Sequence, residues 1–313
     1  MEKERDWMKN KLGFTLLMVL LTVGLLSACG SSSSGSDAGS GAKEQPTTAT
    51  QQESGKSSSA DTGALSKIKE RGKILVGVFS DKPPFGFTNE KGELLGFDND
   101  LARRFAKDLL GDESKIEFVV VEPAGRIPYL QSDKVDLIVA NMTVTDERKE
   151  IVDFTNPNLK VTTQVLVNDK SGIKSLADLK GKKVIVTKGT TADIFFTKNY
   201  PDVELVKFEK NTESLQALKD GRGDGYAQDN FILLAWARKN PGFALIPEKL
   251  EKEAPIAPAV KKGNTELRDW VNQELETLGK EKFLLQLYDK YVKDELGPDV
   301  SPDDIIVEGG HWK

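Results

Sequence analysis

The chain has 313 residues and a formal net charge of −5, with 30% charged and 38% hydrophobic residues. Basic and acidic residues are mixed along it, so no basic stripe indicates a nucleic-acid partner. It has one cysteine, Cys29, and one histidine, His311, which excludes an internal disulfide and argues against a metal or catalytic site built on those residue types. We expect no cofactor.

The N-terminus has the layout of a secretory signal peptide. A cationic stretch precedes an apolar segment from Leu12 to Leu26, which is short for a membrane-spanning helix of about 20 residues. The run Leu26-Ser27-Ala28-Cys29 then resembles the lipobox of bacterial lipoproteins, in which the cysteine is lipidated. We predict a signal peptide over 1–28 and a lipid anchor on Cys29 that holds the protein on the outer side of the cell membrane. A buried cysteine after an apolar run is the alternative.

A flexible linker is predicted over residues 29–63. Its Ser, Gly, Thr, Gln and Ala residues offer little apolar surface to offset the entropy of ordering. A coil of this composition reaches about 30 Å, so the folded part can stand clear of the membrane. An adhesive role for this Ser/Thr-rich stretch remains an alternative.

From about Ala64 onward, short β-branched runs alternate with amphipathic stretches, which indicates an α/β fold with largely parallel strands. The first predicted elements are a strand over 74–78, a helix over 98–109, a strand over 116–121, a helix over 126–131 and a strand over 135–140. The same order recurs as a strand over 183–187, a helix over 191–198, a strand over 203–208, a helix over 213–219 and a strand over 225–227. This recurrence predicts two similar lobes with a ligand cleft beyond the strand ends. The alternative is a single α/β domain in which the similarity of the two series of elements has no structural meaning.

Polar residues follow three of the predicted strands. Arg148 lies in a polar stretch that begins at Asn141, and its guanidinium offers a fork of donors that fits a carboxylate. The turn Gly189-Thr190-Thr191 opens a helix, whose N–H groups suit an anion, and Asp229 could bind an ammonium group. Together these groups complement a zwitterion such as a free amino acid. A surface ion pair, an ordinary glycine turn and a helix cap are the structural alternatives.

The motifs then show a resemblance to a known family. They are Ile74-Leu75-Val76-Gly77-Val78, Pro83-Pro84-Phe85-Gly86-Phe87, the run over 92–102, Thr145-Asp146-Glu147-Arg148 and Leu176-Ala177-Asp178-Leu179-Lys180-Gly181. Over about Leu65 to Gly310 the chain resembles the polar amino acid family of solute-binding proteins of ABC importers. The resemblance implies a two-lobed, type II periplasmic-binding-protein fold with the ligand cleft between the lobes, and an importer permease as partner.

The resemblance also implies roles for individual residues. The residue matching Arg148 holds the ligand carboxylate, and the turn matching 189–191 supplies N–H donors. The residue matching Thr143 contacts the carboxylate or the amine, and the acid matching Asp229 takes the amino group. These are the residues that the strand ends already indicated.

Individual stretches of the sequence bear on the ligand. Four stretches, over 188–193, 197–202, 256–263 and 307–310, look closest to the cysteine-binding and cystine-binding lipoproteins. Aspartate/glutamate-binding members share an arginine at the position of Arg126, which with Lys82 could meet a side-chain carboxylate; two surface cations are the alternative. Phe87 is one of several aromatic residues that could form an apolar wall of the cleft.

The expected organisation is a discontinuous first lobe, over 64–161 and 256–313, and a second lobe over 162–255. A C-terminal helix over about 281–296 would close the first lobe, and we expect a monomer. Two other function classes stay open, a dehydratase-type enzyme that uses a cleft acid or lysine, and a surface adhesin or sensor on the same fold.

Overall fold

The computed structural model describes residues 63–312 of the chain. The predicted signal peptide, the lipidation site Cys29 and nearly all of the predicted linker lie outside these residues. Within 63–312, no helix combines the length and the apolar character that crossing a membrane requires.

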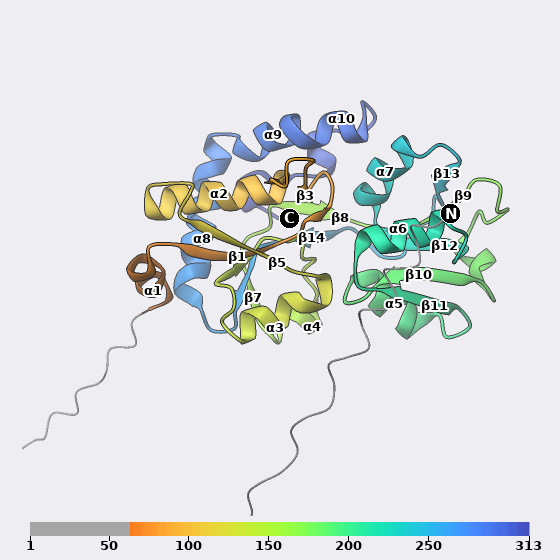
Figure 1. Ribbon diagram of the computed structural model, residues 1–313, viewed down its shortest axis with the longest axis horizontal. Helices are drawn as coiled ribbons and strands as arrows, with labels where there is room; N and C mark the ends of the chain where they lie inside the picture. The colour runs from red at the N-terminus through yellow and green to blue at the C-terminus, as the bar shows by residue number, and fades with distance from the viewer. Residues whose placement is uncertain (1–62, 313) are drawn as a thin grey trace, which may run out of the picture. The chain divides into compact units, whose positions relative to one another are not determined.

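Five strands form the first of two large sheets, in the order β5-β1-β6-β15-β7. Figure 1 labels β1, β5 and β7 of this sheet. Strand β1 runs parallel to β5 and β6, whereas β15 is antiparallel to β6 and β7. The strands are β1 (Ile74–Val78), β5 (Ile116–Val120), β6 (Leu137–Ile138), β7 (Val152–Phe154) and β15 (Ala259–Lys261). A small sheet beside it contains β2 (Asp81–Lys82), β3 (Gly86–Thr88) and β4 (Leu94–Leu95).

The helices of this first lobe cover both faces of its large sheet. Buried side chains of α2, α8 and α9 form one core cluster with β1, and Leu130 of α3 joins a second cluster that contains Ile138. The helices are α1 (Ala64–Arg71), α2 (Phe97–Leu110), α3 (Arg126–Gln131), α4 (Asp146–Lys149), α8 (Thr265–Lys280), α9 (Phe283–Leu287) and α10 (Lys293–Leu296). Short turns of helix occur at η1 (Pro123–Gly125), η3 (Tyr288–Val292), η4 (Pro302–Asp304) and η5 (Glu308–Gly310).

The second lobe is built on the sheet β11-β10-β12-β9-β13. Val184 and Val186 of β10 pack with α5 on one face, and Ile185 between them packs with α6 and α7 on the other, as the alternation of a strand requires. The strands are β9 (Thr163–Asn168), β10 (Lys183–Thr187), β11 (Glu204–Phe208), β12 (Gly225–Asp229) and β13 (Phe243–Leu245). The helices are α5 (Thr191–Asn199), α6 (Asn211–Lys219), α7 (Asn230–Lys239) and the short η2 (Leu176–Leu179).

Two antiparallel strands lie where the chain passes between the two lobes. Strand β8 (Leu159–Val161) follows β7 of the first lobe and leads into β9 of the second. Strand β14 (Ala254–Ile256) follows β13 and leads back into β15. The chain therefore crosses twice between the lobes, at adjacent strands, and such a pair can act as a hinge.

Two predicted elements differ from the structure by more than two residues or by an interruption, whereas the other predicted bounds agree within two residues. The strand predicted over 135–140 is reduced to Leu137–Ile138, because the carbonyls of Ala140 and Asn141 accept hydrogen bonds from Arg126 instead of continuing the ladder. The helix predicted over 281–296 begins only at Phe283 and contains a π-helical turn, η3, in its middle. Its start is set by Glu308, whose carboxylate accepts the N–H groups of Leu284 and Leu285.

Candidate functional site

A small cavity lies between the two lobes, and polar side chains from both of them line it. Little free space remains in it, and its lining residues are each at most 7% exposed. The lining residues are Lys82, Arg126, Asn141, Thr143, Arg148, Thr190, Thr191, Gln228 and Asp229. Eight of the ten predicted ligand-binding residues therefore meet at one place, and Gly189 and Phe87 are not in the lining.

Arg148 reaches the cavity from the short helix α4. Thr145 caps that helix by accepting the Arg148 N–H at 3.2 Å. The guanidinium donates to the Thr143 carbonyl at 2.6 Å and to the Gly189 carbonyl at 2.9 Å. A guanidinium carries five N–H donors, so this arrangement fixes the fork and leaves donors for an anion in the cavity.

Arg126 lies beside Arg148 and is bound more completely to the backbone. It donates to the carbonyls of Pro123, Ala140 and Asn141 at 3.0 Å each and to that of Gly189 at 3.3 Å. Burial and the neighbouring Arg148 hold the pKa of Arg126 well below its ordinary value. Its charge raises the positive potential of the cavity, while most of its donors are already occupied.

Lys82 is the third cation of the cavity. Its ammonium lies 3.9 Å from the centre of the Phe79 ring. Burial and the charge of Arg126 lower the pKa of Lys82 to about 8. The Lys82 amine is thus close to its deprotonation point at neutral pH, and a nearby negative charge would favour its charged form.

The turn at Gly189 serves the site through its carbonyl group. The Gly189 N–H donates to Asp193 at 3.1 Å, so it is not a free donor for a ligand, whereas the carbonyl accepts both arginines. Thr190 caps α5 by accepting the Asp193 N–H at 3.2 Å. Thr191 begins α5 and lines the cavity, so the positive end of that helix faces it.

Asp229 lies opposite the arginines at the carboxyl end of β12. Its backbone N–H donates to the Gln228 side chain at 3.0 Å, and its carboxylate accepts no hydrogen bond from residues 63–312. Burial raises the pKa of Asp229, and the charges of Lys82, Arg126 and Arg148 oppose that rise. A buried carboxylate without a hydrogen-bond donor has room for an ammonium group.

The chain matches a known family over most of the folded part. Residues 74–294 match the model of the bacterial extracellular solute-binding proteins, family 3. The chain belongs to this family. It is 37% identical to the ABC transporter glutamine-binding protein GlnH of Bacillus subtilis (strain 168), over 90% of this chain and 97% of that protein.

Two solved structures are also similar to this family 3 protein. A cysteine-binding protein from Campylobacter jejuni is 46% identical with a TM-score of 0.78, over 79% of this chain and 99% of that one. A solute receptor for L-cysteine of Neisseria gonorrhoeae is 47% identical with a TM-score of 0.76, over 78% of this chain and 99% of that one. The predicted resemblance and the two-lobed type II fold are confirmed. The protein is an amino-acid-binding component of an ABC transporter that acts outside the cytoplasm, and these relatives are binding proteins rather than enzymes.

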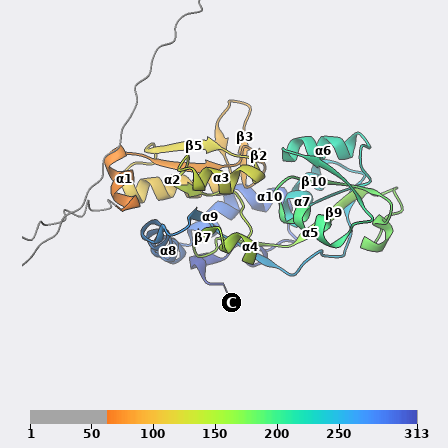
Figure 2. The same cartoon turned by 90° about the horizontal axis from the view of Figure 1, so that it is seen from below.

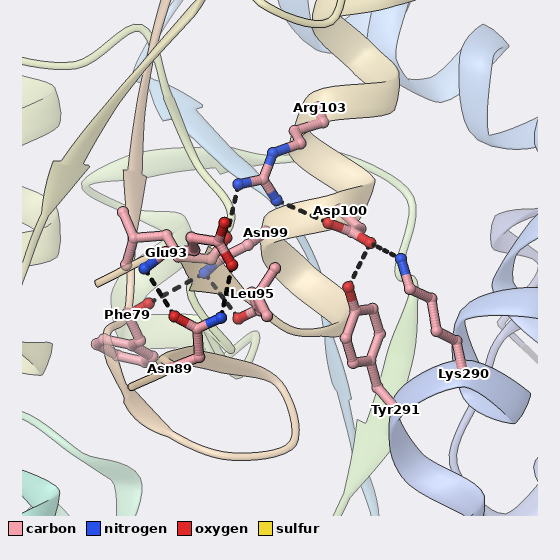
Figure 3. Close-up of polar contacts among 10 residues, drawn as sticks. Phe79, Asn89, Glu93, Leu95, Asn99, Asp100, Arg103, Lys290 and Tyr291 are labelled. Carbon is pink, nitrogen blue, oxygen red and sulfur yellow. Dashed lines mark hydrogen bonds and ion pairs between the residues drawn. The ribbon is translucent and has the colours of Figure 1, made fainter. Parts of the chain in front are cut away.

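Phe87 lies away from the cavity of this family 3 protein. It belongs to β3 and packs edge-to-face on Tyr291, with ring centres 6.4 Å apart. The Tyr291 hydroxyl donates to the Asp100 carboxylate at 2.5 Å, and Lys290 donates to the same carboxylate (Figure 3). Phe87 therefore packs against the C-terminal helical segment instead of forming a wall of the site.

The sequence reasoning missed two residues at the site. Gln228 lines the cavity next to Asp229, and only its adjacency to that residue could have indicated it. Asp98 is the first residue of the helix predicted over 98–109, where a cap is the ordinary expectation, but α2 starts at Phe97 and the Asp98 carboxylate accepts the backbone N–H of Asn141 at 2.9 Å. Asn141 has a left-handed backbone with φ of 42°, so Asp98 supports a strained residue of the cavity lining.

Asp98 should make the stability of the protein depend on pH. Burial raises the pKa of Asp98 from 3.8 to about 7, so the folded state binds this proton more tightly than the unfolded state. Its stabilising contribution is full below the unfolded pKa and is lost as the pH rises toward 7, by up to about 4 kcal/mol. Asp98→Asn, which keeps an acceptor for Asn141, should remove this pH dependence. Urea unfolding at pH 4.5 and 8 measures the change in the free energy of unfolding between the two pH values. An equal change in both proteins would contradict the assignment.

Gly189 sets how closely the lobes can approach. It has φ of 76°, and a Cβ there would lie 2.6 Å from the Cα of Ala124 in η1 of the first lobe. We expect Gly189→Ala to weaken ligand binding at least about tenfold, because the lobes could no longer meet, and to cost about 1–2 kcal/mol for the left-handed backbone. Calorimetric titration measures the affinity.

Gly221 offers a matched control for this substitution. Its φ is 69°, and no atom of the described residues 63–312 lies within 4 Å of a Cβ placed there. Gly221→Ala should lower stability similarly and leave affinity unchanged. If both variants bound ligand as the unsubstituted protein does, the close approach at Gly189 would have no role in binding.

Proposed function

We propose that this protein is a lipid-anchored receptor that binds cysteine or cystine outside the cell and delivers it to the permease of an ABC importer. The observation that carries the proposal is the buried, wholly polar cavity with Arg148 and Asp229 on opposite lobes. The arrangement matches the two charged groups on the α-carbon of a free amino acid. Each charge-assisted hydrogen bond there contributes about 1.5–3 kcal/mol.

Two similar solved structures favour cysteine as the ligand. The cysteine-binding protein from Campylobacter jejuni and the solute receptor for L-cysteine of Neisseria gonorrhoeae are 46% and 47% identical to this chain, above the 37% of the glutamine-binding relative.

An acidic amino acid is the second candidate, because of the charge balance of the site. Three cationic side chains line the cavity and only one carboxylate does. An α-amino acid with a neutral side chain adds no net charge, whereas aspartate or glutamate would bring a carboxylate toward Arg126 and Lys82. A cysteine thiolate would supply the same negative charge in a smaller volume.

The lipid anchor is proposed from the residues around Cys29. Two acyl chains on that cysteine would hold the protein stably on a membrane, each buried methylene contributing about 0.8 kcal/mol. Membership in an extracellular family supports export. We expect Cys29→Ser to release the protein from the membrane fraction into the medium or the periplasm; retention of this variant on membranes would contradict the anchor.

A thermal-shift screen of the twenty amino acids and cystine, in parallel samples with and without reductant, tests the ligand. A ligand at 100 times its Kd adds about 2.7 kcal/mol of stability. For a folded part of this size, that corresponds to a rise in Tm of roughly 5–10 °C. A rise with cysteine or cystine supports the proposal. A rise confined to glutamate and aspartate, or to glutamine, would identify that amino acid as the ligand instead of cysteine. No rise in Tm with any compound would contradict amino-acid binding.

A further inference from the structure

A carboxylate of the first lobe caps a helix of the second lobe. Asp81, in β2, accepts the backbone N–H groups of Asn211 at 2.8 Å and Thr212 at 3.2 Å, the first two residues of α6. The Asp81 carbonyl also accepts the Asn211 side-chain amide at 3.1 Å. Figure 2 shows β2 beside the start of α6, although 130 residues separate Asp81 from Asn211.

The chemistry of this contact makes it favourable only when the lobes meet. The first N–H groups of a helix have no partner within it, and a negative charge there is stabilised by the helix dipole. Within the second lobe, Glu213 accepts the N–H of Lys210 but not those of Asn211 and Thr212. When the lobes separate, these two donors and the Asp81 carboxylate must form hydrogen bonds with water instead.

A buried chain of hydrogen bonds connects this contact to the cavity. The side-chain Oδ1 of Asn211 accepts the Tyr226 hydroxyl at 2.7 Å, and that hydroxyl accepts the Gln228 side-chain amide at 2.9 Å. The Gln228 oxygen in turn accepts the Asp229 N–H at 3.0 Å. Asn211, Tyr226 and Gln228 are each at most 1% exposed, so this chain is shielded from water.

The other side of the contact also reaches the cavity. Asp81 directly precedes Lys82, whose ammonium lines it, so strand β2 carries both the cap and a cavity cation. Because the lining side chains are at most 7% exposed, a bound ligand can leave only after the lobes separate. Separation breaks the bonds of Asp81 to α6.

We infer that Asp81 is a positioning residue that holds the two lobes together around the bound amino acid and thereby slows its release. The inference rests on the proposed function, since it needs a ligand in the cavity. Asp81 does not touch that ligand. It acts through Asn211, which is joined to the Asp229 side of the site by the chain described above.

The test is the dissociation rate of L-cysteine from the full chain in detergent under reducing conditions, followed by stopped-flow fluorescence. Asp81→Ala should raise koff about 10- to 100-fold, as expected for lost hydrogen bonds to a charged acceptor. It should change kon less than about threefold, because the open protein meets the ligand first. Asp81→Asn, which keeps the shape and loses the charge, should give a smaller rise and serves if the alanine variant fails to fold.

Asp178 provides a matched control. Its carboxylate accepts the N–H groups of Lys174 and Ser175 and the Ser175 hydroxyl at 2.9–3.0 Å, all within the second lobe. Asp178→Ala should lower Tm and leave koff unchanged. Asn211→Ala adds a second readout, because it removes the side-chain bonds to the Asp81 carbonyl and to the Tyr226 hydroxyl and should also raise koff.

The outcomes separate this inference from the proposed function. If the unsubstituted protein bound no amino acid, the proposed function would fail and Asp81 would have no ligand to retain. If it bound L-cysteine, or the amino acid that the screen selects, and Asp81→Ala and Asp81→Asn left koff within twofold, the contact would be incidental. A raised koff in Asp81→Ala with an unchanged koff in Asn211→Ala would show that Asp81 does not act through the Asn211 side chain.

Discussion

Replacing Arg148 with alanine is expected to weaken amino-acid binding at least about 100-fold, or about 2.7 kcal/mol, while the protein stays folded. The substitution removes the guanidinium that we assign to the ligand carboxylate. It also frees the Thr143 and Gly189 carbonyls that this group binds at 2.6 and 2.9 Å, so a loss of about 1–2 kcal/mol in stability should accompany it. Isothermal titration calorimetry measures the first effect and urea unfolding the second.

Two further variants show whether the shape of the guanidinium matters. Arg148→Lys keeps the charge and loses the fork of donors, so its affinity should fall between those of the unsubstituted and alanine proteins. Arg268→Ala removes a partly exposed arginine of α8 that forms an ion pair with its neighbour Asp269, outside the cavity lining, and it should leave affinity unchanged. Normal affinity in Arg148→Ala would show that the carboxylate binds elsewhere.

Replacing Asp229 with asparagine should weaken ligand binding about as much as Arg148→Ala does. Its effect on stability should be the opposite of the Arg148→Ala effect. We expect affinity to fall at least about 100-fold, because the partner of the ligand ammonium is lost. Without ligand the variant should be more stable than the unsubstituted protein at neutral pH. Burial raises the pKa of Asp229, which means that the folded protein disfavours its charged form.

The pH dependence of binding tests the same carboxylate. Binding needs the charged form of Asp229, and its pKa is raised, so affinity should decline as the pH falls, beginning above the ordinary titration range of aspartic acid. Asp229→Asn should show no such decline from this group. Calorimetric titrations between pH 4 and 8 measure both profiles, and a profile unchanged by the substitution would exclude Asp229 as the amine partner.

Three elements have the bounds that the sequence predicts, because signals close to them in the chain determine where they begin and end. The bounds of β1, α3 and β10 are those expected from the sequence, because compact apolar runs and clear turn residues mark them. The polar residues at the strand ends were also identified, since parallel strands bring their carboxyl ends to one edge of a sheet. Arg148, the turn residues Thr190 and Thr191, and Asp229 meet in the cavity for this reason, whereas the family resemblance indicated Thr143, Arg126 and Lys82.

The differences arise from contacts between distant segments. The pattern around Phe87 cannot show that its ring faces Tyr291, which lies more than 200 residues later in the chain. Asp98 sits at the start of a helix, where a capping role is the ordinary expectation, yet its side chain bonds to Asn141. The Gly189 turn was expected to present its N–H, which Asp193 takes, and its carbonyl was found to join the lobes through two arginines.

The most direct test of the account is a calorimetric titration of the full chain in detergent with L-cysteine under reducing conditions. We expect the protein to bind one cysteine per chain saturably, and we expect this binding to be lost in both Arg148→Ala and Asp229→Asn. Binding that survives both substitutions would place the ligand outside the cavity between the lobes. No binding of cysteine, cystine or any of the other amino acids would contradict the central claim that this cavity receives a free amino acid.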